Sequence, residues 1–101
     1  MARRIVWSTP SLQDLAEIRD YISQDSALHG KKFLRSLRST VENLREFPRL
    51  GRVVPEFENV SVREILLVDY RIIYRLGPEE RIEIVRVRHV KRLFGPKDLG
   101  E

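Results

Sequence analysis

The sequence predicts an α+β domain in the order β-α-α-β-β-β, with an N-terminal helical hairpin packed on a small twisted, mainly antiparallel sheet. Apolar residues recur at helical spacing between about residues 10 and 47, and at a period of two between about residues 60 and 90. Stretches that contain turn-forming residues such as Pro48, Gly51 and Asp69 separate these segments. A chain of 101 residues can bury one core, so residues 1–101 are expected to form a single domain.

The first strand and the first helix are expected near the N-terminus. Residues 3–7 suit a short strand, with Ile5 and Trp7 on one face. Thr9-Pro10 is typical of a helix start, because the hydroxyl caps the helix and Pro at the first helical position loses no hydrogen bond. The helix is expected to reach about residue 24, and its apolar face consists of Leu12, Leu15, Ile18 and Ile22. The charged residues expected off that face are Asp14, Glu17, Arg19 and Asp20.

The second helix is expected to begin after Asp25-Ser26, which interrupts the apolar series and supplies a cap. Its apolar residues have a heptad-like spacing and are Phe33 or Leu34, Leu37, Val41, Leu44 and Phe47. Pro48 and Gly51 end the helix, and residues 48–59 are expected to form a loop. Because so few residues separate the two helices, they are expected to pack as an antiparallel hairpin.

Three strands are expected in the second half of the chain, beginning with residues 60–66 and a turn at Asp69. One face of the next strand holds Tyr70, Ile72, Tyr74 and Leu76. The opposite face holds Arg71, Ile73 and Arg75. Residues 77–80 form a hairpin turn before the last strand, residues 81–89. In that strand, alternation places Arg86 and Arg88 on one face and leaves the other face to Val85, Val87 and His89.

The charge of the chain is small in total but unevenly distributed. The net charge of +4 comes from 19 bases, mostly Arg, and 15 acids. Residues 31–38 contain four bases and no acid, and residues 86–97 contain five bases and no acid. An excess of Arg is typical of proteins that bind polyanions, because Arg grips phosphate through two hydrogen bonds. It is equally typical of a chain from an Arg-rich genome.

Several classes of protein are excluded by composition. The lack of Cys excludes disulfides, thiolate zinc sites and Cys nucleophiles, and two His residues are too few for a His-rich metal site. No apolar stretch approaches the length of a membrane span, and none follows Arg3-Arg4 as it would in a signal peptide. We therefore expect a cytoplasmic protein that binds no metal, no cofactor and no membrane.

Glu56, Arg71 and His89 are of the types that phosphodiester cleavage requires: a base, a cation for the phosphate and an acid for the leaving oxygen. Their spacing does not assign these roles. A His at the end of a strand is often held by neighbouring backbone, and Arg side chains on a strand face are often only solvated. Further bases that accompany this set are Arg63, Arg86, Arg88, Lys91 and Arg92.

A second group of bases lies on the outer stripe of the second predicted helix and consists of Lys31, Arg35, Arg38 and Arg45. This stripe can be a solvated helix face, in which Glu42 pairs with its neighbours at helical spacing. It can also dock an acidic partner or a nucleic acid. The residues alone leave both interpretations open.

Six short segments form a recognisable series along the chain. They are Trp7 to Pro10, Asp14-Leu15 with Ile18 and Tyr21-Ile22, Phe47 to Arg52, Val62 to Ile65, Tyr70 to Arg75, and Val87 to Arg92. Together and in this order, these segments resemble the RelE/ParE superfamily of type II toxins. The resemblance covers roughly residues 5–94. The fold that it implies, a twisted antiparallel sheet with an N-terminal helical hairpin, agrees with the prediction from periodicity.

The resemblance implies one of two activities. RelE-like members are ribosome-dependent endoribonucleases that cut mRNA, and in such a member Glu56 would be the base, His89 the acid and Arg71 the ligand of the phosphate. ParE-like members are DNA gyrase inhibitors without a complete nuclease site. Val90 follows His89 where nuclease members usually carry an aromatic residue, and the loop before the second strand has no lysine pair. These departures favour a ParE-like gyrase inhibitor that arrests growth, with the mRNA endoribonuclease as the alternative.

The resemblance also implies partners. A cognate antitoxin, ParD-like or similar, is expected to neutralise the toxin, and operator DNA is expected to be bound only through that antitoxin. Acidic groups of the antitoxin are expected to meet Lys31, Arg35 and Arg38. The target is expected to be DNA gyrase, or alternatively the ribosome with mRNA. The basic surface that meets it is expected to comprise Arg63, Arg71, Arg86, Arg88, Lys91 and Arg92.

Overall fold

A computed structural model describes residues 3–92 and 94–95. Lys97, the last of the five bases in residues 86–97, lies outside these residues. The elements are β1 (Arg4–Trp7), α1 (Thr9–Ser23), α2 (Ala27–Glu42), a 3₁₀ turn η1 (Asn43–Arg45), β2 (Arg52–Val53), β3 (Val62–Leu67), β4 (Tyr70–Leu76) and β5 (Arg81–His89). Over the described residues the strands form one sheet in the order β1-β5-β4-β3-β2. The β1–β5 pair is parallel and the other pairs are antiparallel, so the predicted α+β fold is confirmed.

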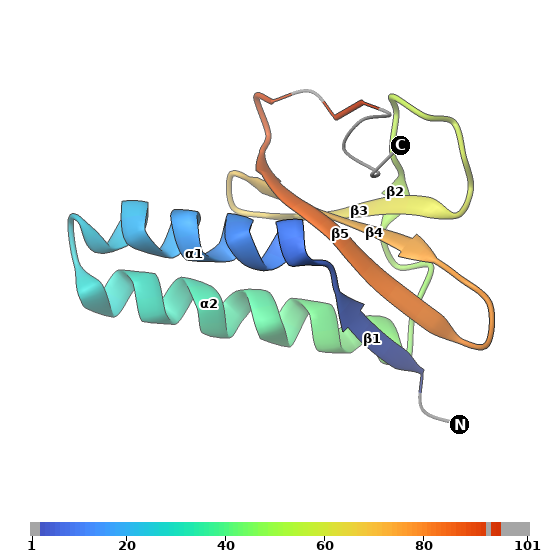
Figure 1. The fold of residues 1–101 in the computed structure, drawn as a ribbon, viewed down its shortest axis with the longest axis horizontal. Coiled ribbons are helices and arrows are strands. Elements are labelled where there is room, and N and C mark those ends of the chain that lie inside the picture. The colour runs from blue at the N-terminus through green and yellow to red at the C-terminus, as the bar shows by residue number, and fades with distance from the viewer. Residues whose placement is uncertain (1–2, 93, 96–101) are drawn as a thin grey trace.

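The two helices form the predicted antiparallel hairpin and lie side by side next to the sheet (Figure 1). The cap of α1 is Ser8, whose hydroxyl accepts a hydrogen bond from the Ser11 amide at 3.0 Å. The expectation of a Thr9 cap was therefore wrong by one residue, because Ser8 also donates to the Val85 carbonyl at 2.7 Å and so ties the helix start to β5. Ser26 caps α2.

The hairpin covers one face of the sheet with the main apolar core. Its fully buried members are Leu37, Val41, Leu44, Ile72, Tyr74, Ile82, Ile84 and Val87. Leu15 and Ile18 of α1 pack against them, as predicted. Leu12 is 51% exposed and Phe47 is 60% exposed, so placing these two on buried helix faces was wrong. Leu12 lines a solvent-open hollow between α1 and α2, and Phe47 lies beyond the end of the helical segment.

The opposite face of the sheet carries a smaller core under the segment that connects β2 to β3 and under the chain after β5. Its buried members are Val54, Val62, Ile73, Val85 and Phe94. Phe57 packs against this cluster and its ring meets that of Phe94 edge to face at 5.3 Å. Both faces of β4 are therefore covered. The smaller core packs on the face that the sequence predicts to hold Arg71, Ile73 and Arg75.

Two features of the sheet differ from the sequence prediction. The stretch expected to be loop contains β2, which pairs with Arg63 and Glu64 of β3. The register of β4 with β5 shifts, so that Ile73 lies opposite Arg86 while Tyr74 lies opposite Ile84. Val85 is the extra residue of this bulge, and its side chain joins the smaller core while Val87 joins the main core. Placing these two valines on one face was therefore wrong.

The helices are short and amphipathic, and none of those in the described residues is long and apolar enough to cross a bilayer.

Candidate functional site

Arg71 lies in the middle of β4 and its side chain is 7% exposed. Its Nε donates to Glu64 at 2.6 Å, and its Nη1 and Nη2 donate to the two carboxylate oxygens of Glu56, each at 2.8 Å. Nη1 also donates to the backbone carbonyl of Arg92 at 3.2 Å. The guanidinium thus joins β4, the segment after β2 and the segment after β5.

Glu64 and Glu56 hold this cluster together from two sides. The Glu64 side chain is fully buried, and it also accepts a hydrogen bond from Arg52 at 2.6 Å. Glu56 accepts from the Phe94 amide at 3.1 Å. The hydrogen bonds from Arg71 lower the pKa of Glu56 from 4.5 to about 2, against the opposing effect of burial. Hydrogen bonding to Glu56 likewise raises the pKa of Arg71, so both groups are charged at neutral pH.

His89 stands apart from this cluster. The register places Tyr70 opposite His89 and Arg71 opposite Arg88. Because neighbouring residues of a strand point to opposite faces, Tyr70 and His89 share the helix-covered face, and Arg71 faces the other way. The His89 ring meets the Tyr70 ring edge to face at 5.6 Å, and its Nδ1 accepts from the Lys91 amide at 3.2 Å. The structure therefore brings Glu56 and Arg71 together but does not bring His89 to them.

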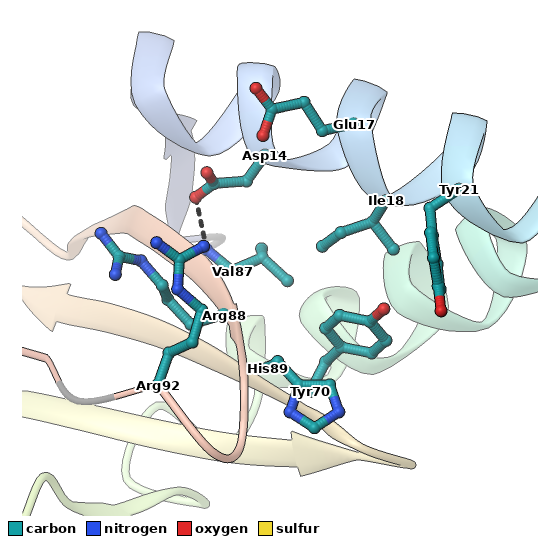
Figure 2. Close-up of a pocket in the computed structure, with 9 residues that line it drawn as sticks. All are labelled: Asp14, Glu17, Ile18, Tyr21, Tyr70, Val87, Arg88, His89 and Arg92. Carbon is teal, nitrogen blue, oxygen red and sulfur yellow. Dashed lines mark hydrogen bonds between the residues drawn. The ribbon is translucent and has the colours of Figure 1, made fainter.

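His89 lines a hollow of about 190 Å³ between α1 and the end of β5. Figure 2 shows the side chains of Arg88 and Arg92 at one end of it, near Asp14, and the rings of Tyr21, Tyr70 and His89 at the other. Part of the predicted basic surface thus lines the same hollow as aromatic side chains of α1 and β4. Because the carboxylates of Asp14 and Glu17 also line the hollow, its charges are mixed.

Asp14 closes this hollow from α1 and is buried, at 8% exposed. Its carboxylate accepts from Arg86 Nε at 2.7 Å, from Arg86 Nη2 at 2.9 Å and from the Val87 amide at 2.9 Å. The prediction that Asp14 lies off the buried face of its helix was wrong, because α1 lies along β5 where β1 ends and uses Asp14 to satisfy that edge. Arg86, expected on the target-binding surface, is engaged in this contact.

The remaining predicted bases have different surroundings. Arg63 donates to the backbone carbonyls of Val60 at 2.9 Å and Gly51 at 2.9 Å, so its guanidinium braces the loop before β2. Lys91 and Arg92 are exposed at the end of the sheet. Three further exposed bases follow one stripe of α2: Lys31, Arg35 and Arg38.

Sequence reasoning missed Glu64 and Asp14 as members of ion-paired clusters. An acid on the same strand face as an apolar residue, such as Glu64 two residues after Val62, was the available signal. Among the residues that the structure describes, no group of three His, Asp or Glu side chains could hold a metal ion.

Each comparison with known proteins finds toxins or toxin–antitoxin systems. Residues 5–94 match the family described as ParE toxin of type II toxin–antitoxin systems, parDE. The chain is 33% identical to Toxin RelE2 of Caulobacter vibrioides, over 89% of this chain and 98% of that protein. It is also 33% identical to Putative toxin Y4kP of Sinorhizobium fredii, over 86% of this chain and 88% of that protein.

Solved structures share the fold. The chromosomal ParDE toxin–antitoxin system from P. aeruginosa contains a chain with a TM-score of 0.72 at 20% identity, covering 87% of this chain and 96% of that one. A variant of the E. coli toxin RelE in the free state has a TM-score of 0.64 at 16% identity, covering 90% and 86%. The RelBE2 toxin–antitoxin complex from Mycobacterium tuberculosis gives 0.57 at 21% identity, covering 88% and 99%.

Proposed function

The chain belongs to the ParE toxin family of type II toxin–antitoxin systems, and from this premise we propose that it inhibits DNA gyrase without catalysing a reaction of its own. The observation that carries the proposal is the engagement of Arg71. Its guanidinium is buried and holds two carboxylates, with Glu56 gripping it through both oxygens. A phosphate would bind Arg through the same fork, so Glu56 takes the place of that ligand.

The other two residues of the nuclease alternative support the same conclusion. A general base works best with a pKa near the operating pH, and a Glu56 pKa of about 2 makes its carboxylate a weak proton acceptor. His89 points to the opposite face of the sheet and has its own contacts with Tyr70 and Lys91. In this arrangement Glu56, Arg71 and His89 do not converge on one scissile phosphate.

We also propose that a cognate antitoxin binds and neutralises this toxin. Support comes from the similar ParDE and RelBE2 structures, which are a toxin–antitoxin system and a toxin–antitoxin complex. A hollow of about 320 Å³ between α1 and α2 is lined by Trp7, Leu12, Leu15, Val41, Arg38 and Glu42. Apolar side chains of the antitoxin fit this hollow, and its acidic groups meet the exposed bases of α2. Those bases are Lys31, Arg35 and Arg38.

The direct test uses purified toxin with DNA gyrase and relaxed plasmid. Supercoiling is expected to be inhibited at stoichiometric toxin, with accumulation of cleaved DNA bound to gyrase, and the purified antitoxin is expected to reverse the effect. Unchanged supercoiling would remove this proposal.

A parallel reaction with translating ribosomes tests the endoribonuclease alternative. The proposal predicts intact mRNA at toxin concentrations that stop supercoiling. Cleavage at codon intervals, lost in a His89→Ala variant that keeps its fold, would establish the alternative instead.

A further inference from the structure

Some of the bases expected to bind the target instead make contacts within the protein. Arg63 braces backbone carbonyls, Arg71 holds two carboxylates and Arg86 is paired with Asp14. If the toxin docks on gyrase, as proposed above, other surface must contribute. The loop after η1 supplies a surface of the required kind.

This loop, residues 47–51, is held firmly from the inside. The hydroxyl of the buried Tyr74 donates to the Pro48 carbonyl at 2.8 Å and accepts from the Gly51 amide at 2.9 Å. Arg63 donates to the Gly51 carbonyl from the side. A Cβ at Gly51 would collide with the Glu64 backbone carbonyl and lie 2.8 Å from the Tyr74 hydroxyl, so this close approach requires glycine.

The loop presents apolar side chains to solvent. Phe47 is 60% exposed and Leu50 is 57% exposed, with Arg49 exposed between them. Isolated exposed apolar residues are ordinary, but two on one firmly held loop form a preorganised contact. Docking such a loop costs little conformational entropy, so less of the gain from burying its side chains is lost to ordering the loop.

A hollow of about 210 Å³ adjoins the loop, at the opposite end of β5 from the His89 hollow. Pro48, Leu76 and Ile82 give it apolar walls, and Arg3, Arg49 and Arg81 give it positive charge. Among the described residues that line it, Glu80 is the one acid, and it is paired with Arg3 at 2.7 Å. Figure 1 shows the loop region following η1 at the end of the hairpin beside β1, away from the α1–α2 connection.

We propose that the 47–51 loop and this hollow form the surface that docks on an acidic segment of gyrase carrying an apolar anchor residue. The inference rests on the proposed function and names the part of the toxin that recognises the target. The positive rim selects an acidic partner, and the exposed Phe47 and Leu50 indicate a protein surface because they offer apolar area for burial.

The test measures inhibition of supercoiling and binding to gyrase for two variants, the double substitution Phe47→Ser with Leu50→Ser, and Arg49→Glu. Each is expected to lose about tenfold or more in both measurements. Thermal unfolding and affinity for the purified antitoxin are expected to stay at wild-type values. Matched controls are Val68→Ser, which changes a residue that is 80% exposed on the turn after β3, and Arg19→Glu on α1.

A third variant separates the loop's position from its side chains. Tyr74→Phe removes two of the hydrogen bonds that hold the loop and leaves the side chains of Phe47, Arg49 and Leu50 unchanged. Gyrase affinity is expected to fall several-fold, because the loop is then less firmly held before it docks.

Three outcomes would overturn the inference. The result for the wild type shows whether the loop proposal alone fails or the proposed function fails as well. Wild-type inhibition with unchanged loop variants would show that gyrase is bound elsewhere. Loss of antitoxin binding in place of gyrase binding would assign the loop to the antitoxin. A wild type that does not inhibit gyrase would remove the proposed function and this inference with it.

Discussion

The Arg71 guanidinium lies between two carboxylates in the middle of the sheet, and its side chain is 7% exposed. Removing a charge from water is costly, and the fully buried Glu64 carboxylate depends on nearby cations to offset that cost. Arg52 reaches Glu64 from the rim, while Arg71 reaches it from within the sheet. Arg71 is therefore expected to affect folding before it affects any function.

Arg71→Ala is expected to lower the free energy of unfolding by about 3 to 5 kcal/mol, because it leaves Glu64 without its inner partner. Urea unfolding followed by circular dichroism measures this change. Arg75→Ala is a suitable control, since Arg75 pairs with Glu83 in a partly exposed position and its loss should cost about 1 kcal/mol or less. Similar small losses in both variants would contradict the structural role of Arg71.

Glu56 makes the stability of the fold depend on pH. Its pKa is about 2 in the folded protein, below the ordinary 4.5 that it regains on unfolding, so the unfolded chain binds more protons between these values. The contribution of Glu56 is therefore complete above pH 4.5 and is lost as the pH falls towards 2. Glu56→Gln is expected to remove this part of the pH dependence and to lower stability at neutral pH. An unchanged slope in acid-unfolding curves would contradict the pairing with Arg71.

Helix α1 is fastened to the sheet at the edge that β1 leaves open. Asp14 accepts hydrogen bonds from the Arg86 guanidinium and from the Val87 amide, so one carboxylate satisfies both a charge and a backbone donor. The Ser8 hydroxyl ties the start of the same helix to Val85. These contacts set the wall of the His89 hollow, which lies between α1 and β5.

Asp14→Ala is expected to cost about 3 kcal/mol, because the Val87 amide and the Arg86 guanidinium both lose a partner in a mostly buried place. Asp14→Asn, which keeps an acceptor, is expected to lose less. The control is Asp20→Ala, whose pair with Arg19 is exposed, and its cost should lie within about 0.5 kcal/mol. Equal losses at the two positions, measured by chemical denaturation, would refute this role of Asp14.

Elements with a long periodic pattern could be predicted from the sequence, and shorter features could not. Both helices and β3 to β5 follow apolar spacings that depend only on which side is buried. β2 has two residues, too few to display a period, and it is defined by its pairing with β3. The bulge at Val85 is likewise set by the register with β4, which local sequence does not encode.

At the scale of the whole molecule, the uneven charge of the chain divides between the fold and the surface. Glu56 and Arg71 could be selected by residue type and do meet, whereas His89 lies on the other face because adjacent strand positions alternate. Arg71 also pairs with Glu64 across the β3–β4 turn, and Arg86 pairs with Asp14, which is 72 residues away in the chain. Neither pair can be recognised before the tertiary structure is known. The exposed bases of α2 and the rim of the 47–51 loop remain available to macromolecular partners.

Inhibition of gyrase by a His89→Ala variant tests the central claim most directly, because His89 is essential to a nuclease and dispensable to a toxin that acts by docking. The variant is expected to inhibit supercoiling within about twofold of wild type, as for other substitutions away from a contact surface. The account would be contradicted if the wild type cleaved mRNA on ribosomes and left supercoiling unchanged. In that case a folded His89→Ala variant would no longer arrest growth.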